Sequence, residues 1–261
     1  MLLPNDRTHE GFDGDHRRSL VFAPLFLLVW GCSGQIHENG EAARRIAFQD
    51  NTYDTYLVDL NETELLFFLS DKAGSRFENF AKLKQQLGTT GKELVFATNG
   101  GMFQSSLEPN GLYIENGELM FPLDLTSGEG NFYLKPNGVF QLSSKSAAIV
   151  PSSKWKAVDD IQFATQSGPL LVANGKPHPR LAVASQSKYI RSGVGLISQN
   201  RVIFAISNEP VNFYDFAMFF KDCLKCRDAL YLDGQISKMY LPDLNRHELD
   251  GRFGPLIAVA R

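Results

Sequence analysis

Cysteine and histidine are scarce in this chain of 261 residues, which holds three Cys and five His. His9, His16 and His37 lie near the N-terminus, so only His178 and His247 remain for a metal site or a Ser-His-Asp triad. Gly-x-Ser-x-Gly elbows and Gly-x-x-x-x-Gly-Lys-Ser/Thr loops are absent as well. These absences argue against an elbow-type serine hydrolase and a P-loop nucleotide hydrolase. No metal site and no cofactor is predicted, and metal dependence is left open.

An excess of basic charge is also missing. The chain has 26 Lys and Arg against 29 Asp and Glu, a net charge of −3, and no basic block. Because nucleic-acid binding relies on clustered positive charge, we predict no nucleic-acid partner. Hydrophobic residues make up 43% of the chain, with 20 Phe among them, which suffices for the sizeable core of a single domain.

The chain lacks an apolar run of the ~20 residues that span a bilayer. A shorter apolar run, residues 19–29, follows a pair of arginines and precedes Gly31 and Cys32, as in a secretory signal. Residues 29–32 read Val-Trp-Gly-Cys and resemble a bacterial lipobox, in which Cys32 is lipidated and becomes the mature N-terminus. An ordinary signal peptide with an incidental Cys32 is the alternative.

We therefore predict a lipoprotein-type signal peptide over residues 1–32, a polar tether over residues 33–50 and a folded domain over residues 51–261. This organisation implies an exported protein of the bacterial periplasm or outer membrane. A lipid anchor on Cys32 would hold it at the membrane.

The other two cysteines, Cys223 and Cys226, form a Cys-x-x-Cys pair. Such a pair is compatible with a local disulfide, a redox motif or half of a zinc site. Zinc needs further ligands, and neither a second pair nor a nearby His is present. Since an exported protein meets an oxidising compartment, we predict a disulfide between Cys223 and Cys226 at the end of a helix.

The hydrophobic pattern predicts an α+β fold, a single domain with a large, mainly antiparallel or mixed sheet and a few helices. Short apolar or alternating runs predict strands, and Asn-Gly or Gln-Asn pairs predict hairpin turns between them. The predicted strands include residues 53–60, 65–69, 94–98, 229–233 and 257–260, and the predicted turns lie at residues 116–117, 137–138, 174–175 and 199–200. Two helices are predicted, one capped by Asn79 and ending at Gly88, the other capped by Asn212 and covering residues 213–224.

Polar residues beside glycines follow or begin several of these apolar runs. The most informative run is Ala-Leu-Tyr-Leu-Asp-Gly at residues 229–234, in which a buried strand ends on Asp233. An acid at the mouth of a buried strand is held rigidly and still meets solvent. Residues 98–103, 165–169 and 191–195 have the same design. We expect these four corners to converge on one polar pocket.

These four motifs occur in the order seen in the phosphodiester glycosidase family, and the sequence resembles that family over most of its length after about residue 53. The family includes the lysosomal uncovering enzyme, which removes N-acetylglucosamine from a phosphodiester on mannose, and bacterial proteins labelled as exopolysaccharide-related. The resemblance implies a carbohydrate or sugar-phosphate substrate.

Asp233 is the first candidate for a catalytic carboxylate, as a nucleophile or as the group that activates water. Glu209, at the end of a predicted strand, is a candidate second carboxylate. Arg191 carries a planar guanidinium suited to two phosphate oxygens and is the predicted phosphate clamp. The remaining predicted substrate-binding residues are Asn99, Gly100, Gly101, Thr165, Ser167, Gly168 and Ser237. Each also has a plain structural interpretation, such as an Asp that caps a turn or an exposed Glu at a strand end.

The combined prediction is an exported hydrolase that cleaves a sugar–phosphodiester linkage at the anomeric carbon, in envelope or exopolysaccharide metabolism. The alternative is a non-catalytic, envelope-anchored protein that binds or assembles polysaccharide. The catalytic hypothesis requires Asp233, Arg191 and Asn99 to lie together.

Overall fold

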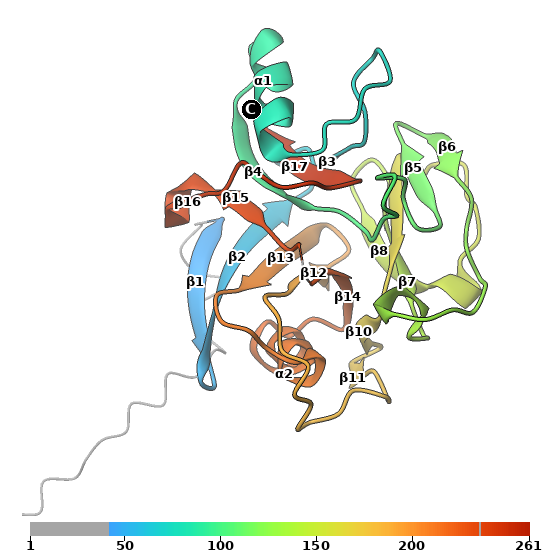
Figure 1. Cartoon of the computed structure of the whole chain (residues 1–261), viewed down its shortest axis with the longest axis vertical. Helices are drawn as coiled ribbons and strands as arrows, with labels where there is room; N and C mark the ends of the chain where they lie inside the picture. The colour runs from blue at the N-terminus through green and yellow to red at the C-terminus, as the bar shows by residue number, and fades with distance from the viewer. Residues whose placement is uncertain (1–41, 235) are drawn as a thin grey trace, which may run out of the picture. The chain divides into compact units, whose positions relative to one another are not determined.

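Antiparallel strands dominate the structure, a computed structural model that describes residues 42–234 and 236–261 (Figure 1). The seventeen strands of this part are β1 (Ala43–Phe48), β2 (Asn51–Asp59), β3 (Leu66–Phe68), β4 (Leu94–Asn99), β5 (Tyr113–Glu115), β6 (Glu118–Phe121), β7 (Gly138–Leu142), β8 (Ala147–Pro151), β9 (Phe163–Ser167), β10 (Leu170–Ala173), β11 (Lys176–Pro177), β12 (Ser192–Ser198), β13 (Arg201–Ser207), β14 (Asp228–Asp233), β15 (Met239–Leu241), β16 (Arg246–His247) and β17 (Leu256–Ala260). The helices are α1 (Phe80–Thr89) and α2 (Phe213–Met218), which continues into a π-helical turn, Phe219–Cys223. Short 3-10 turns occur at Asn131–Tyr133, Ser152–Lys154 and Pro242–Leu244.

These strands form three sheets. The largest has the order β1-β2-β13-β12-β14-β10-β11, and two five-stranded sheets have the orders β16-β15-β4-β17-β3 and β6-β5-β9-β7-β8. Every pair of named strands is antiparallel. The prediction of an α+β fold is therefore confirmed.

One apolar cluster receives side chains from all three sheets. Phe204 and Leu230 come from the largest sheet, Phe96 and Ile257 from the second and Phe140 from the third, and each is at most 1% exposed. Ring contacts cross the sheet boundaries, with the centroids of Phe96 and Phe204 5.1 Å apart. Burial of this many large side chains is the main force that holds the sheets together.

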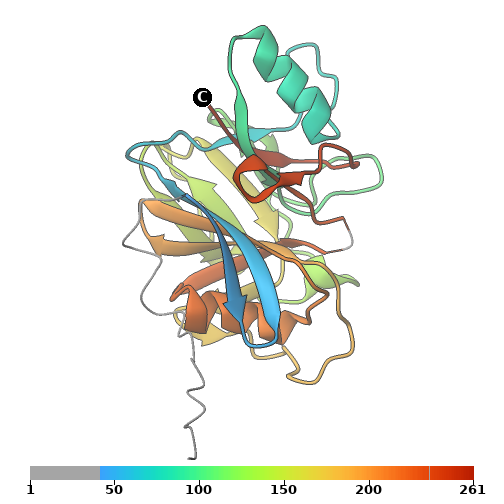
Figure 2. The same ribbon diagram turned by 90° about the vertical axis from the view of Figure 1, so that its left-hand side faces the viewer.

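The two helices cover other sheet faces. The stretch from α2 through the π-helical turn packs on the largest sheet, where the rings of Phe219 and Tyr53 stack with centroids 3.8 Å apart. Helix α1 packs on β4 and β17 of the second sheet. Figures 1 and 2 show α1 at the top against these strands and α2 at the bottom against the largest sheet. Asn79 and Asn212 cap the helices as predicted, each accepting a backbone N–H with its side chain.

Three of the four predicted hairpins are confirmed. Asn116 and Asn174 have φ angles of 52° and 50°, each followed by a Gly with positive φ, as a tight turn requires. The β12–β13 hairpin turns at residues 199–200 as predicted. The hairpin predicted at Asn137 is wrong, because the residues before it form a 3-10 turn and Asn137 donates its side-chain N–H to the carbonyl of Phe132. β7 pairs instead with β8 and β9.

The tether predicted over residues 33–50 extends too far toward the C-terminus. β1 lies inside that range and pairs with β2 in a register that joins Ala43 to Tyr56 and Phe48 to Asn51. The apolar side chains of Ile46 and Phe48 pack against the cluster around α2, which explains why this stretch joins the sheet. The predicted signal peptide and the predicted lipid anchor at Cys32 lie outside the described residues. Within those residues, no helix is long and apolar enough to cross a membrane.

The predicted disulfide between Cys223 and Cys226 is also wrong, because Cys226 is a free and buried thiol. Lys225 has a φ of 58°, and this left-handed residue turns the chain so that the Cys226 side chain packs on the backbone of Gly195 in β12. Burial raises the pKa of the Cys226 thiol, which keeps it protonated. Cys226 is therefore a core side chain.

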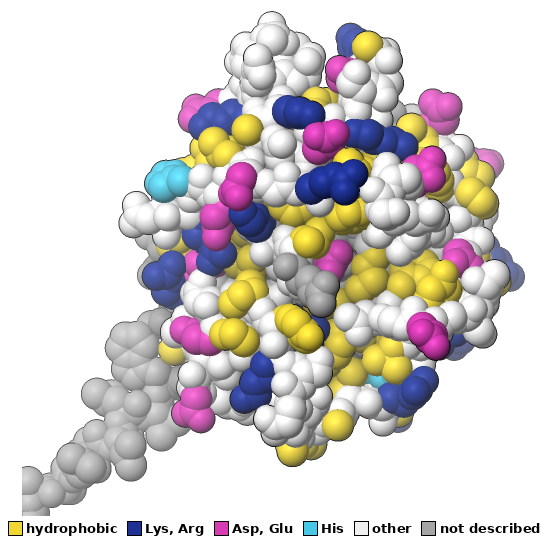
Figure 3. All heavy atoms as spheres, viewed as in Figure 1, with side chains coloured by type: hydrophobic (Ala, Val, Ile, Leu, Met, Phe, Trp, Pro, Cys, Tyr) yellow, Lys and Arg dark blue, Asp and Glu magenta, His cyan; other side chains and the backbone are white. Residues whose placement is uncertain are grey.

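On the face shown in Figure 3, basic and acidic side chains are intermingled, and hydrophobic side chains gather near the centre and toward the right. The charge pattern on that face agrees with the small net charge of the chain. Six large hydrophobic side chains of the described residues are exposed: Leu119, Met120, Leu125, Val158, Val183 and Tyr189.

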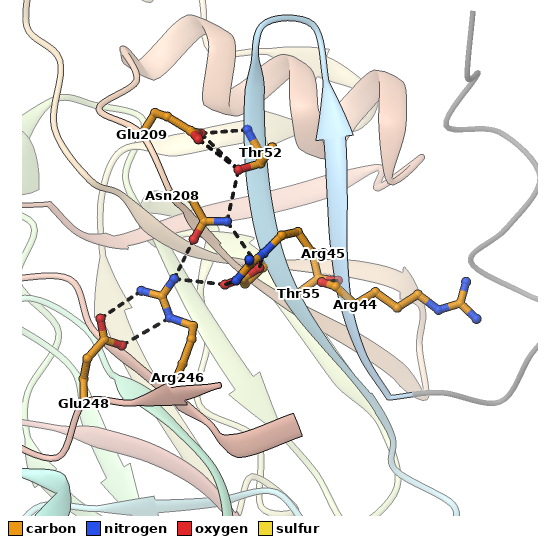
Figure 4. A network of polar contacts seen from close by, with 9 residues as sticks. Arg44, Arg45, Thr52, Thr55, Asn208, Glu209, Arg246 and Glu248 are labelled. Carbon is orange, nitrogen blue, oxygen red and sulfur yellow. Dashed lines mark hydrogen bonds and ion pairs between the residues drawn. The ribbon is translucent and has the colours of Figure 1, made fainter. Parts of the chain in front are cut away.

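A polar network joins the largest sheet to β16 (Figure 4). Its centre is Asp54, whose side chain is fully buried and accepts bonds from Arg45 at 2.7 Å and Arg246 at 3.0 Å. Arg246 also donates to Asn208 and pairs with Glu248. Burial alone would raise the pKa of Asp54, but the hydrogen bonds from Arg45, Arg246 and Asn208 outweigh it and hold the pKa below 3.8.

We predict that Arg246→Met destabilises the fold by about 2–4 kcal/mol, because it removes one partner of a buried carboxylate. Because the pKa of Asp54 is lower in the folded protein than in the unfolded chain, its ionised form stabilises the fold. This stabilisation is complete above the pKa of the unfolded chain and is lost as the pH falls through the lowered pKa of the folded protein. The difference from wild type should therefore shrink below about pH 4. Urea unfolding at two pH values measures both effects.

Arg252→Met is the matched control, because Arg252 is exposed and makes one bond, to the carbonyl of Ser105. Its effect should stay within about 0.5 kcal/mol. Equal losses for the two variants would contradict the central role of Asp54.

Candidate active site

The ends of three strands and one loop meet at Asp233, as the sequence predicts. Asp233 ends β14, and Ser192 at the start of β12 lies opposite it in register. The Ser192 hydroxyl lies 3.1 Å from Oδ1 of Asn99, which ends β4. Ser237 follows in the loop after β14, and its hydroxyl lies 2.9 Å from Ser192 Oγ and 2.5 Å from the carbonyl oxygen of Asp233. Residues that are far apart in the chain thus form one polar cluster.

A β-bulge sets the direction of Asp233. In the β12–β14 pairing, Gly193 faces Tyr231 and Ser192 faces Asp233, so Leu232 is the extra residue. The carbonyl of Leu232 accepts a hydrogen bond from Ser167 Oγ at 2.9 Å. Ser167, a predicted substrate-binding residue, is thus engaged with the backbone of the strand that carries Asp233. Ser237 is engaged in the same way.

Asp233 is a half-buried carboxyl with few partners. Its Oδ1 accepts a hydrogen bond from the backbone N–H of Gly234 at 2.5 Å, and within the described residues it forms no ion pair. Burial raises its pKa from 3.8 to about 6, and the bond from Gly234 opposes part of that rise. A carboxyl that titrates near neutral pH is suited to proton transfer.

Arg191 is 1% exposed, and its guanidinium lies near the residue after Asp233, since a Cβ added to Gly234 would be 3.6 Å from Arg191 Nη1. It donates to the carbonyls of Val211 and Ser187 and to the Tyr231 hydroxyl, at 2.8, 2.9 and 3.1 Å. The ring of Phe213 lies 3.7 Å from its Cζ. Burial lowers the pKa of Arg191, and no carboxylate of the described residues pairs with it.

Arg191 is therefore less free than a phosphate clamp at a surface. Three of its N–H groups have acceptors among the described residues, and its other two N–H groups have none there. Buried charges are normally paired, so an unpaired buried cation favours an anionic ligand nearby.

The predicted glycines allow close backbone contacts. A Cβ on Gly101 would clash with Thr165 Oγ1 and with the carbonyl of Gln166, and a Cβ on Gly100 would lie 2.8 Å from Pro255 Cβ. A Cβ on Gly168 would lie 2.6 Å from Asn137 Cβ. The predicted site residues around Gly101 and Thr165 are thus packed together. These glycines are required by tight packing at the site.

Two buried polar atoms of the predicted site have no hydrogen-bond partner in the described structure, Nδ2 of Asn99 and Oγ1 of Thr165. Asn99 and Thr165 are each 1% exposed. Leaving a buried polar group without a partner costs about 1–3 kcal/mol. Unsatisfied buried polar groups are rare in folded proteins and call for an explanation, of which a ligand-binding role is one.

The structure does not bring Glu209 to this cluster. Its carboxylate accepts bonds from the backbone N–H of Thr52 at 2.7 Å and from the Thr52 hydroxyl at 3.0 and 3.2 Å (Figure 4). Glu209 is exposed and belongs with the β1–β2 hairpin. Its position at a strand end is compatible with a catalytic carboxylate and with an exposed structural Glu, and the contacts with Thr52 favour the structural role.

Sequence reasoning missed Ser192, Tyr231 and Phe213. Ser192 lies within the motif at residues 191–195, but its neighbour Arg191 attracted the functional interpretation. Tyr231 and Phe213 show no signal in the sequence, because an aromatic residue in a buried strand or helix is normally core. Within the described residues, no group of three or more His, Cys, Asp or Glu could hold a metal ion.

Comparison with known proteins gives concordant findings. Residues 92–255 match a family described as phosphodiester glycosidase. A protein of Escherichia coli K12, named uncharacterized protein YigE, is 39% identical over 202 residues, which cover 77% of this chain and 79% of that protein.

Two solved structures are similar in fold. One is the catalytic domain of zebrafish N-acetylglucosamine-1-phosphodiester alpha-N-acetylglucosaminidase, auto-inhibited by its pro-peptide, with a TM-score of 0.57, 13% identity and 85% of both chains covered. The other is a putative exported protein from Burkholderia pseudomallei K96243, with a TM-score of 0.51, 9% identity and coverage of 80% of this chain and 74% of that one. At these identities, the likeness shows a shared fold.

We predict that Asp233→Asn stabilises the protein at neutral and alkaline pH. The raised pKa means that the folded state favours the protonated carboxyl. That preference stabilises the fold fully below about pH 4 and is lost as the pH rises through about 6. An Asn cannot ionise, so the variant should exceed wild type by about 1–3 kcal/mol at about pH 8 and match it near about pH 4.

Urea unfolding at both pH values tests this, with Asp50→Asn at the exposed β1–β2 turn as the control. A difference between Asp233→Asn and wild type that does not change with pH would contradict the burial of an ionising carboxyl.

Proposed function

This chain belongs to the phosphodiester glycosidase family, and we propose that it is a hydrolase that cleaves the bond between the anomeric carbon of a sugar and a phosphodiester oxygen. The observation that carries the proposal is one half-buried carboxyl, Asp233, in a predicted site that also holds donors without a hydrogen-bond acceptor among the described residues. These donors are Asn99 Nδ2, Thr165 Oγ1 and the remaining N–H groups of Arg191. A phosphodiester supplies oxygens to such donors and a negative charge to the unpaired guanidinium.

The proposed reaction needs little assistance from a general acid. A phosphate monoester is a good leaving group, so the C1–O bond can break without a second carboxylic acid. The oxygen of water bonds to C1, the bonding electrons leave with the phosphate oxygen, and the Asp233 carboxylate takes the proton from water. Arg191 stabilises the phosphate charge in the transition state.

The absence of Glu209 from the cluster favours this single-carboxylate scheme. Glycosidases with two carboxylates place them about 5 Å or about 6.5–9.5 Å apart across the scissile bond. Every hydrogen-bond partner of Glu209 in the described residues belongs to the β1–β2 hairpin. A covalent intermediate would also need a group to activate water in its second step, whereas direct attack by water needs one base.

The cellular setting is part of the same proposal. The signal-like N-terminus with Cys32 supports export to the bacterial envelope, where the substrate would be an envelope or exopolysaccharide sugar phosphodiester. A palmitate label that disappears in Cys32→Ser, together with release of that variant from the membrane fraction, would test the lipid anchor.

We predict that Asp233→Asn lowers kcat by at least about 100-fold on a panel of α- and β-linked sugar-1-phosphodiesters, with little change in substrate binding. In wild type, kcat/KM should rise with pH through an apparent pKa near 6, because the carboxylate form accepts the proton. Glu209→Gln should keep kcat within about twofold and the same pH profile. Release of free sugar or of the phosphate monoester, measured by coupled assay at several pH values, gives kcat and kcat/KM for wild type and both variants.

Near wild-type turnover in folded Asp233→Asn would contradict the mechanism. If wild type releases no sugar or phosphate monoester from any panel member but binds the ligands, the alternative of a non-catalytic polysaccharide-binding protein is favoured.

We predict that Arg191→Lys impairs phosphodiesters more than aryl glycosides of the same sugar, by about tenfold or more in the ratio of kcat/KM. Lysine keeps the positive charge but loses the planar fork and the fixed contacts to Val211 and Tyr231. The ratio cancels a general loss of folded protein. Equal losses on both substrate types would show that Arg191 only supports the structure.

A further inference from the structure

We infer that Ser192 is a positioning residue, which fixes the side-chain amide of Asn99 so that its NH₂ group donates a hydrogen bond to an oxygen of the substrate. The inference deepens the proposed function and rests on it. The sequence places Ser192 in the motif at residues 191–195 but gives it no separate role, and that role follows from contacts between strands.

The orientation of the Asn99 amide is determined by its neighbours. Oδ1 of Asn99 receives the Ser192 hydroxyl at 3.1 Å and the backbone N–H of Lys238 at 3.3 Å, with Thr98 Oγ1 at 3.5 Å. A hydroxyl can donate or accept, but a backbone N–H can only donate. Exchanging Oδ1 and Nδ2 would set the amide N–H against the N–H of Lys238, so this assignment is the favoured one.

The proton of Ser192 also has a defined direction. The Ser237 hydroxyl donates to the Ser192 oxygen, and the acceptors left for the Ser192 proton are Asn99 Oδ1 at 3.1 Å and the carbonyl oxygen of Asp233 at 3.4 Å, of which Asn99 Oδ1 is the nearer. Ser237 Oγ lies 2.9 Å from Ser192 Oγ on its other side. Ser192 is fully buried and its backbone is held in β12 opposite Asp233. The hydroxyl therefore has little freedom to turn elsewhere.

A consequence is that Nδ2 of Asn99 faces away from all of these partners. It is buried and has no acceptor in the described structure. A ligand oxygen would complete it, and a sugar phosphodiester offers ester, non-bridging phosphate and hydroxyl oxygens. A donor held in place before the substrate arrives loses no rotational freedom when it binds the transition state.

A double-mutant cycle on kcat/KM tests whether Ser192 acts through Asn99. Ser192→Ala should lower kcat/KM by about tenfold in wild type and by less than about twofold in Asn99→Ala, because the amide it orients is then gone. Ser167→Ala is the matched control. Ser167 is also a buried serine whose hydroxyl bonds a backbone carbonyl of β14, that of Leu232, but among the described residues it forms no side-chain hydrogen bond with Asn99. Its effect should be the same in both backgrounds.

If Ser192→Ala lowers kcat/KM by the same factor in wild type and in Asn99→Ala, as expected for Ser167→Ala, the inference is overturned. Ser192→Thr, which restores a hydroxyl, should recover activity where the variant keeps the melting temperature of wild type. A folded Ser192→Thr that stays as impaired as Ser192→Ala would also count against a positioning role.

A measurement without substrate separates this inference from the proposed function. The two Nδ2 proton resonances of Asn99 are identified by their disappearance in Asn99→Ala. They should shift in Ser192→Ala and stay unchanged in Ser167→Ala. Unchanged Asn99 resonances in Ser192→Ala would refute the inference even if the enzyme hydrolyses phosphodiesters. Shifted resonances in a protein that hydrolyses none would leave the positioning contact established and the proposed function wrong.

Discussion

The end of a doubly buried strand is the constraint on which the site depends. On β14, Leu230 and Leu232 face the cluster shared by the three sheets, and Ala229 and Tyr231 face the cluster around α2. With apolar packing on both faces and antiparallel neighbours β12 and β10 on both edges, the strand has no freedom to slip. Asp233 is therefore presented at a fixed place, and the bulge at Leu232 sets its direction. Ser192 and Tyr231 derive their positions from the pairing of β12 with β14, whereas Ser167 belongs to β9 of another sheet and reaches β14 through its bond to the carbonyl of Leu232.

Burial acts on the two ionisable groups of the site in opposite senses. It raises the pKa of Asp233 and lowers that of Arg191, so the free protein disfavours the charged form of both. Neither group has an ion-pair partner among the described residues. A phosphodiester beside Arg191 compensates the cation, and a water molecule at Asp233 gives the carboxylate a proton to accept. The unfavourable electrostatics of these two groups are thus the basis of the proposed selectivity.

The network around Asp54 shows the contrasting arrangement. Asp54 is as deeply buried as any acid of the described chain, yet two arginines and Asn208 satisfy it and its pKa falls. That network joins β2 to β16 and serves stability. The comparison explains why Glu209 is the weaker catalytic candidate, since it is bound to Thr52 next to the satisfied network. The number of hydrogen-bond and ion-pair partners, more than the residue type, distinguishes the structural acids Asp54 and Glu209 from Asp233, the proposed catalytic acid.

Local features of the sequence were sufficient for much of the fold and part of the site. Helix caps at Asn79 and Asn212, the turns at Asn116 and Asn174, and the carboxylate that ends β14 depend on neighbouring residues, so pattern alone predicted them. Contacts between residues far apart in the chain could not be predicted from the local sequence and became visible only in the tertiary structure. Such contacts place β1 in the sheet, leave Cys226 a free thiol, and take Glu209 to the β1–β2 hairpin. The contact between Ser192 and Asn99, 93 residues apart, belongs to the same class, because register between strands depends on packing of the whole core.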